Sequence, residues 1–232
     1  IFHHKLGTES DRIKRISDIA LDIARIINAD LKSTEIAVSL CKLDLVSEMV
    51  YEYPELQGVI GKYYSKKAGF KSSISEACYE HYLPKGQFDE VPRKPLSVVL
   101  ALADRIDTIC SFWAIDLKPT GSKDPFALRR AAIGIIRILL ENELDLSLIA
   151  LLKLGNGNLD FDNLIDFFNE RIRSQFVDKG IRLDVIKSIN IKTYQEISLN
   201  EIFQRTFAVH NFVMTDAGES LIQGYKRAVN IL

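Results

Sequence analysis

A basic loop near the middle of the sequence has the composition of a phosphate-binding site. Residues 118–124, KPTGSKD, are polar and turn-forming, and an apolar helical pattern follows them. We place the start of that helix at Pro125, because proline suits the first helical position and Asp124 is a good cap before it. Free amide groups and the positive dipole end of a helix attract phosphate. The cations available to such a site are Lys118, Lys123, Arg129, Arg130 and Arg137.

A purely structural role fits the same loop. Arg130 and Arg137 are two turns apart and share a face of the expected helix. In a capped helix, such arginines commonly pair with Asp or Glu on neighbouring elements, and most other exposed charges are only solvated. The residues alone leave both interpretations open.

A second set of residues has the types that bind metal ions. Asp104 stands inside the apolar run 100–107, where a buried carboxylate needs a partner. Residues 103–107, ADRID, resemble the last metal-binding segment of the helical HD-type phosphohydrolases, which also use an adjacent His-Asp pair. At the place of that pair this chain has residues 41–44, CKLD, with a lysine cation and one carboxylate. The degenerate set comprises His4, Asp44, His81 and Asp104.

The lysine argues against a bound metal, because one cation repels another. We therefore expect no metal at this set, and we expect Asp104 to pair with Lys42 or Arg105. The sequence also lacks the G-x-S-x-G, P-loop, G-x-G-x-x-G and C-x-x-C patterns. Nucleotide and acyl-transfer sites of the common kinds are therefore not encoded.

The elements that hold these residues are expected to be helices. Apolar residues recur at helical spacing and no long stretch alternates in the manner of a strand, which predicts an all-α protein. Thr8 and Asp11 predict a capping box at the first helix. The expected helices cover residues 8–27, 33–51, 55–67, 72–82, 96–113, 125–140, 146–154, 161–177, 183–189, 199–212 and 216–232.

Composition limits the class of protein. The 232 residues are 47% hydrophobic with a net charge of -1, so no global field attracts nucleic acid or a membrane, and any polyanion site must be local. No apolar run is long enough for a membrane span. Three widely spaced cysteines fit buried free thiols in a reducing compartment, and no export leader is visible, so we expect a cytoplasmic protein.

The turn-forming residues 155–158, GNGN, predict a domain boundary. We divide the chain into residues 1–155 and 156–232. The last helical pattern still runs where the sequence stops, so we expect this chain to be a piece of a longer protein, with an incomplete second unit.

Six segments, in this order and spacing, resemble the bacterial glycyl-tRNA synthetase β subunit family. The resemblance covers essentially the whole chain. The segments are residues 2–8 (FHHKLGT), 42–50 (KLDLVSEMV), 54–58 (PELQG), 80–84 (EHYLP), 103–107 (ADRID) and 119–130 (PTGSKDPFALRR).

The resemblance implies a part of a tetrameric ligase that joins glycine to its tRNA using ATP. The first unit would be an HD-like helical bundle, and the second a helical linker with the beginning of an anticodon-binding domain. The α subunit would handle glycine and ATP, and the β subunit would engage glycine tRNA without a membrane. This part would then hold no catalytic residue and no bound cofactor, and the basic loop becomes a candidate RNA contact.

Three hypotheses therefore remain: a tRNA-binding part of a ligase, a metal-dependent phosphohydrolase of nucleotides, and an all-α scaffold for the α subunit. The missing His-Asp pair argues against the second hypothesis. The cations of the loop argue against the third.

Overall fold

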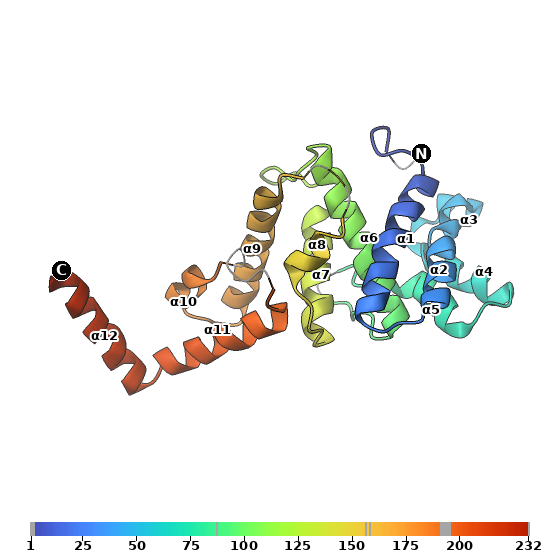
Figure 1. Cartoon of the computed structure of the whole chain (residues 1–232). Coiled ribbons are helices and arrows are strands. Elements are labelled where there is room, and N and C mark those ends of the chain that lie inside the picture. The colour runs from blue at the N-terminus through green and yellow to red at the C-terminus, as the bar shows by residue number, and fades with distance from the viewer. Residues whose placement is uncertain (1–2, 87, 156, 158, 191–195, 232) are drawn as a thin grey trace.

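The chain folds into helices joined by short loops, as the computed structural model in Figure 1 shows. The structure describes residues 3–86, 88–155, 157, 159–190 and 196–231. Within these residues there is no strand, and only two isolated bridges join backbone segments. The predicted all-α class is confirmed.

Twelve α-helices and two short 3-10 helices make up the described part of the chain. They are α1 (Glu9–Ile26), α2 (Leu31–Leu40), η1 (Leu43–Val46), α3 (Glu48–Glu52), η2 (Pro54–Leu56), α4 (Val59–Lys67), α5 (Ser72–Glu80), α6 (Pro95–Ala114), α7 (Leu128–Glu141), α8 (Leu148–Leu152), α9 (Phe161–Asp178), α10 (Leu183–Ser188), α11 (Leu199–Val213) and α12 (Asp216–Ile231).

Helix α6 is the centre of the bundle. Its sequence is apolar on nearly every face, so it can be stable only when neighbours surround it. Helices α1, α2, α5 and α7 pack against it, and Figure 1 shows α6 in green between α1 and the α7–α8 pair. Two carboxylates and an arginine sit in this buried helix, namely Asp104, Arg105 and Asp107. The packing of α6 therefore fixes the surroundings of these charges.

The start of α1 is built as its sequence predicts. The Thr8 side chain accepts a hydrogen bond from the amide of Asp11, and the Asp11 carboxylate accepts one from the amide of Thr8. This reciprocal pair satisfies two amides that the helix itself cannot. The cap fixes where α1 begins, and hence which of its side chains face α6.

The predicted helix over residues 33–51 is wrong in its extent. Helix α2 begins earlier, after the cap Asp30, and ends at Leu40. The chain then forms η1 and the separate helix α3, which has its own cap at Ser47. Lys42 lies in the short break after Leu40, and its side chain is buried there.

The predicted helix start at Pro125 is also wrong. Helix α7 begins at Leu128, after Ala127 in the left-handed region at a φ of 54°. The ring of Phe126 stacks on Phe112 of α6, with the ring centroids 4.0 Å apart. This long-range contact holds residues 125–127 as a turn against α6 instead of a first helical turn.

The hydrophobic core continues past the predicted boundary at residues 155–158. Buried Phe168 and Phe176 of α9 belong to the same core cluster as α6 and α7. Residues 156 and 158 lie outside the described part of the chain, and the division into two domains stays a prediction. Helix α12 contacts α11 and extends away from the other helices in Figure 1.

Candidate functional site

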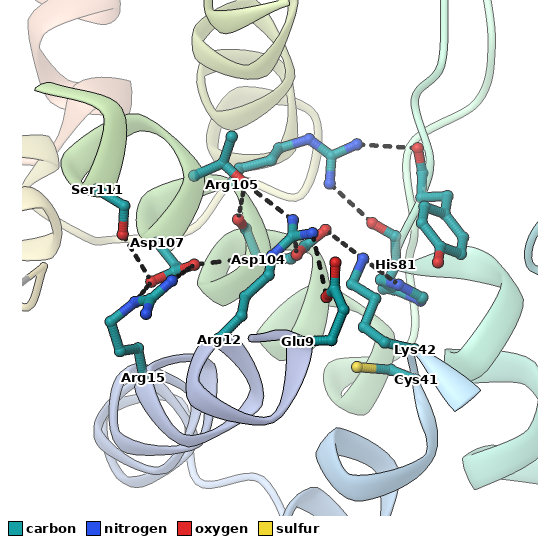
Figure 2. Close-up of polar contacts among 12 residues, drawn as sticks. Glu9, Arg12, Arg15, Cys41, Lys42, His81, Asp104, Arg105, Asp107 and Ser111 are labelled. Atoms are coloured by element: carbon teal, nitrogen blue, oxygen red, sulfur yellow. Dashed lines mark hydrogen bonds and ion pairs between the residues drawn. The ribbon is translucent and has the colours of Figure 1, made fainter. Parts of the chain in front are cut away.

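A buried lysine stands at the centre of the predicted metal-type cluster. The Lys42 Nζ lies 2.9 Å from Asp104 Oδ2 and 3.0 Å from His81 Nε2. Lys42 is only 3% exposed, and its ammonium also lies 4.2 Å from the centre of the Tyr82 ring. Figure 2 shows the three side chains meeting: Asp104 belongs to α6, His81 directly follows α5, and Lys42 lies between α2 and η1. The expectation that Asp104 pairs with Lys42 is confirmed.

The lysine also fixes the protonation of His81. An ammonium has only donors, so His81 Nε2 must accept from it, and the ring proton then sits on Nδ1. There it donates to the backbone oxygen of Ala77 at 3.1 Å. Burial, and after it the nearby Lys42 cation, hold the pKa of His81 well below its ordinary value. His81 is therefore a neutral imidazole.

Asp104 is held by a second cation that the sequence did not reveal. Arg12 Nη2 of α1 lies 2.9 Å from Asp104 Oδ1, opposite the oxygen that faces Lys42. Burial by itself would raise the pKa of Asp104, but Lys42 and Arg12 together lower it well below the usual range. Asp104 is thus a carboxylate with both oxygens paired.

A parallel pair lies one helical turn further along α6. Arg15 Nε of α1 lies 2.6 Å from Asp107 Oδ1, and the Ser111 hydroxyl donates to the same oxygen at 3.1 Å. Arg12 and Arg15 are three residues apart, as are Asp104 and Asp107, so each pair shares a helix face. This matched spacing is the signal that could have pointed to the α1–α6 contact.

The alternative prediction, an ion pair between Arg105 and Asp104, is wrong. Its guanidinium donates instead to four backbone oxygens, at distances of 2.8 to 3.2 Å. Burial lowers the pKa of Arg105 to about 10, so the group is still a cation at neutral pH. The acceptors belong to His81, Ala101, Tyr82 and Pro84.

Two members of the predicted set lie away from the lysine. Asp44 Oδ2 accepts a hydrogen bond from the amide of Gly58 at 2.6 Å, and burial raises its pKa. His4 packs beside the ring of His3 at 4.3 Å. Within the described residues, no three His, Cys, Asp or Glu side chains are arranged to hold a metal ion. The side chains that do meet fit the Lys42 ammonium and not a metal.

Two of the helix amides that the sequence predicts to be free at the basic loop are hydrogen-bonded. The carboxylate of Asp124 accepts from the amides of Leu128 and Arg129, at 2.8 and 2.9 Å. Asp124 therefore does cap the helix, but from four residues before its first residue. Its negative charge occupies the position where a phosphate would bind to the helix end.

The five predicted cations of the loop differ in how they are bound. Lys118 pairs with Asp116 at 3.1 Å, and Arg137 donates to Glu141 and to two backbone oxygens. Arg129 donates to the backbone oxygen of Gly121 at 2.6 Å, which closes the loop. The other two, Lys123 and Arg130, are exposed and make no side-chain hydrogen bond or ion pair with the described residues. Their role in RNA binding stays a prediction.

The chain is similar to known proteins over its whole length. The family model described as the glycyl-tRNA synthetase beta subunit matches residues 1–190. The chain belongs to this family. The glycine–tRNA ligase β subunit of Ruegeria sp. (strain TM1040) is 47% identical over 232 residues, which cover all of this chain and 34% of that protein. That of Paracoccus denitrificans (strain Pd 1222) is 45% identical over 231 residues, with the same coverage.

This member of the glycyl-tRNA synthetase β subunit family spans about a third of the length of the curated relatives. The match of the family model includes the whole Lys42 cluster and the basic loop. Among the described residues, no helix combines the length and the hydrophobicity needed to cross a membrane.

Proposed function

We propose that this chain is the part of a glycine–tRNA ligase β subunit that supports the tRNA, within an enzyme that attaches glycine to its tRNA using ATP. The observation that carries the proposal is membership of the glycyl-tRNA synthetase β subunit family over residues 1–190. The α subunit and glycine tRNA are the partners in this proposal. The chain itself binds no cofactor and contributes no catalytic residue to it.

The Lys42 cluster supports a binding role over hydrolysis. A metal-dependent phosphohydrolase needs a cation that can accept ligands and activate water. The Lys42 ammonium is a donor only, and it already satisfies His81 Nε2 and Asp104 Oδ2. The same contacts that stabilise the cluster therefore argue against an inherited hydrolase.

The tRNA surface of the proposal is the basic loop with its two unpaired cations. Lys123 and Arg130 need no rearrangement to reach a phosphate, because no described residue holds them. Arg129 is next to Arg130 in the sequence, and it becomes available when it releases the backbone oxygen of Gly121. Phosphate contacts of this kind position a protein on RNA without reading its sequence.

The cytoplasm is the compartment in this proposal. All three cysteines are buried free thiols, as a reducing compartment allows. They are Cys41, Cys78 and Cys110.

The test is a filter-binding titration of glycine tRNA with the complete enzyme at increasing salt. Changing Lys123, Arg129 and Arg130 together to alanine should lower the magnitude of the salt slope by up to about three units, roughly one for each lost phosphate contact. The charging of tRNA should fall, and tRNA-independent formation of glycyl-adenylate should stay nearly intact.

A matched control replaces three exposed lysines elsewhere by alanine: Lys32, Lys67 and Lys153. This variant should keep the wild-type slope. A loss of charging that comes with a lower melting temperature or a dissociated α subunit would show a structural role for the loop. An unchanged slope in a well-folded loop variant would move the tRNA surface elsewhere, first to Lys226 and Arg227.

A further inference from the structure

A dense group of exposed apolar side chains covers η1, α3 and η2. Five large apolar residues between positions 43 and 53 are exposed, and the most accessible are Tyr51 at 87% and Val46 at 82%. Three glutamates stand among and beside them. We call the exposed side chains of Leu43, Val46, Glu48, Met49, Tyr51, Glu52, Tyr53 and Glu55 the 43–55 face.

The apolar part of this face is larger than scattered surface residues explain. The exposed fractions of its five apolar residues equal about three fully exposed large residues. At about 150 to 250 Å² for each large side chain, this is roughly 500 Å². The elements that carry it adjoin one another, because η1 and η2 both contact α3. An apolar patch of this area marks an interaction site, and it is more than half of what one partner contributes to a standard protein interface.

The chain under the 43–55 face is fixed to the bundle. Val50 is the buried residue of α3, and its amide donates to the Ser47 hydroxyl, which caps the helix. The Asp44 carboxylate accepts a hydrogen bond from the amide of Gly58, which joins η1 to the start of α4. A surface that is held in this way loses little conformational entropy when a partner binds.

The charges of the face argue against RNA as its partner. Residues 43–61 contain no lysine or arginine. Glu48, Glu52 and Glu55 are exposed, and their side chains make no ion pair or hydrogen bond with the described residues. RNA binds through cations that neutralise its phosphates, and free carboxylates repel it. Of the two partners in the proposed function, the protein therefore fits this face and the tRNA does not.

A second copy of the chain does not fit the face either. Two copies that meet about a two-fold axis use the same surface on both sides. The three glutamates of one copy would then face those of the other, and like charges across an interface weaken binding. A suitable partner instead has an apolar surface flanked by cations. We propose that the 43–55 face binds the α subunit, through an apolar surface of that subunit bordered by lysine or arginine side chains.

This inference rests on the proposed function, which supplies the α subunit as the protein partner. The position of the face agrees with it. Figure 1 shows α3 and α4 at the side of the bundle opposite to α12. The rim of the face continues into a pocket of about 360 Å³, whose lining includes Glu55 of the face and Arg130 of the basic loop. An α subunit on this face therefore lies next to the proposed tRNA surface.

The test is the association of the full-length β subunit with its α subunit, measured by surface plasmon resonance without tRNA. Val46→Ser and Tyr51→Ser together should raise the dissociation constant about tenfold or more, because a few residues, tyrosine prominent among them, contribute most of the energy of an interface. Tyr51→Phe, which keeps the ring, should bind nearly as tightly as wild type. Changing Glu48, Glu52 and Glu55 together to glutamine should slow association about tenfold at low salt, and the difference should shrink at high salt.

Matched controls lie outside the face. Phe88 is 94% exposed in the loop before α6, and Phe88→Ser should leave the affinity for the α subunit unchanged. Glu35 is exposed on α2, and Glu35→Gln should leave the association rate unchanged. All the substituted side chains are exposed, so the melting temperatures should stay close to that of wild type.

An unchanged affinity for the α subunit in the double variant of Val46 and Tyr51 would overturn the proposal. Loss of tRNA binding at an unchanged affinity for the α subunit would also overturn it, because the face would then bind RNA. A change in the self-association of the β subunit alone would overturn it in favour of a second copy.

The proposed function is tested separately, by the salt slope of the variant at Lys123, Arg129 and Arg130. A normal slope in that variant, together with weakened α-subunit binding in the face variants, would contradict the tRNA surface and support this inference. A reduced slope together with normal α-subunit binding in the face variants would support the tRNA surface and overturn this inference.

Discussion

Replacing Asp104 by asparagine tests the central claim about the Lys42 cluster, namely that a buried carboxylate holds two cations in place. The variant keeps the shape and one acceptor oxygen but removes the charge. Arg12 retains Glu9 and Asp107 at 3.7 and 3.8 Å. Lys42 loses the only carboxylate within ion-pair distance among the described residues. The cost should therefore arise mainly at Lys42.

The expected destabilisation is about 3 kcal/mol, at the lower end of the cost of leaving one partner of a buried pair unpaired. For a protein of this size, that free energy corresponds to a fall in melting temperature of roughly 6 to 12 °C. Urea unfolding gives the free energy directly. The control is Asp22→Asn at the exposed Asp22–Arg25 pair on α1, which should cost less than about 1 kcal/mol.

A double-mutant cycle separates the energy of the Lys42–Asp104 interaction from the other effects of each substitution. Lys42→Met leaves Asp104 paired with Arg12 at 2.9 Å, so it should cost less than Asp104→Asn. In the double variant no unpaired lysine remains. Its loss of unfolding free energy should therefore be smaller than the sum of the two single losses by about 1 kcal/mol or more. Strict additivity, or a loss below about 1 kcal/mol for Asp104→Asn alone, would refute the reasoning.

The pH dependence of the free energy of unfolding tests the charge of Asp104 independently. The folded-state pKa of Asp104 lies below its unfolded value of about 3.9, so its contribution is fully present above that unfolded value. It is lost as the pH falls towards the folded pKa. The stability difference between wild type and Asp104→Asn should therefore be constant above about pH 5 and shrink below pH 4. A difference that grew on acidification would contradict the assigned charge.

Three other expectations follow from the structure. Calorimetry with manganese or zinc should give no one-site isotherm, because the Lys42 ammonium fills the place of the metal, and a tight one-site isotherm would contradict this. Asp124→Ala should cost about 0.5 to 2 kcal/mol in urea unfolding, since two helix amides lose their acceptor; a neutral result would show that water replaces the cap. Burial raises the pKa of Cys41 and Cys110 to about 12 and that of Cys78 to about 11, so maleimide at pH 7.5 should label them only after unfolding.

The helical period predicted most of the elements, because an amphipathic pattern is a local property. The capping box at Thr8 and the apolar helix that carries Asp104 are examples. The lysine pairing of Asp104 was also predictable, because a buried carboxylate requires a cation and Lys42 stands at the position of a lost ligand. For the helices the deciding information lies within a short segment, and for Asp104 it lies in the types of two residues that are 62 positions apart.

The errors arose where a distant contact decides a local boundary. Helix α2 ends at Leu40, and Lys42 just after it contacts His81 and Asp104, which are distant in the sequence. The start of α7 depends on the stacking of Phe126 on α6, which overrides the preference of Pro125 for a first helical turn. The local sequence of neither segment predicts these contacts.

The pairing of α1 with α6 shows which information would have predicted the partners of the buried carboxylates. Arg12 and Arg15 are ordinary helix cations when α1 is considered alone, and Asp104 and Asp107 have a costly burial when α6 is considered alone. When the two helices are considered together, two cations and two carboxylates at the same spacing pair with each other. These pairs explain how α6 can bury two acidic residues. Lys42 then supplies the charge that a metal would otherwise have to supply to Asp104. The carboxylate is retained as a structural group that holds Lys42 and Arg12 in place.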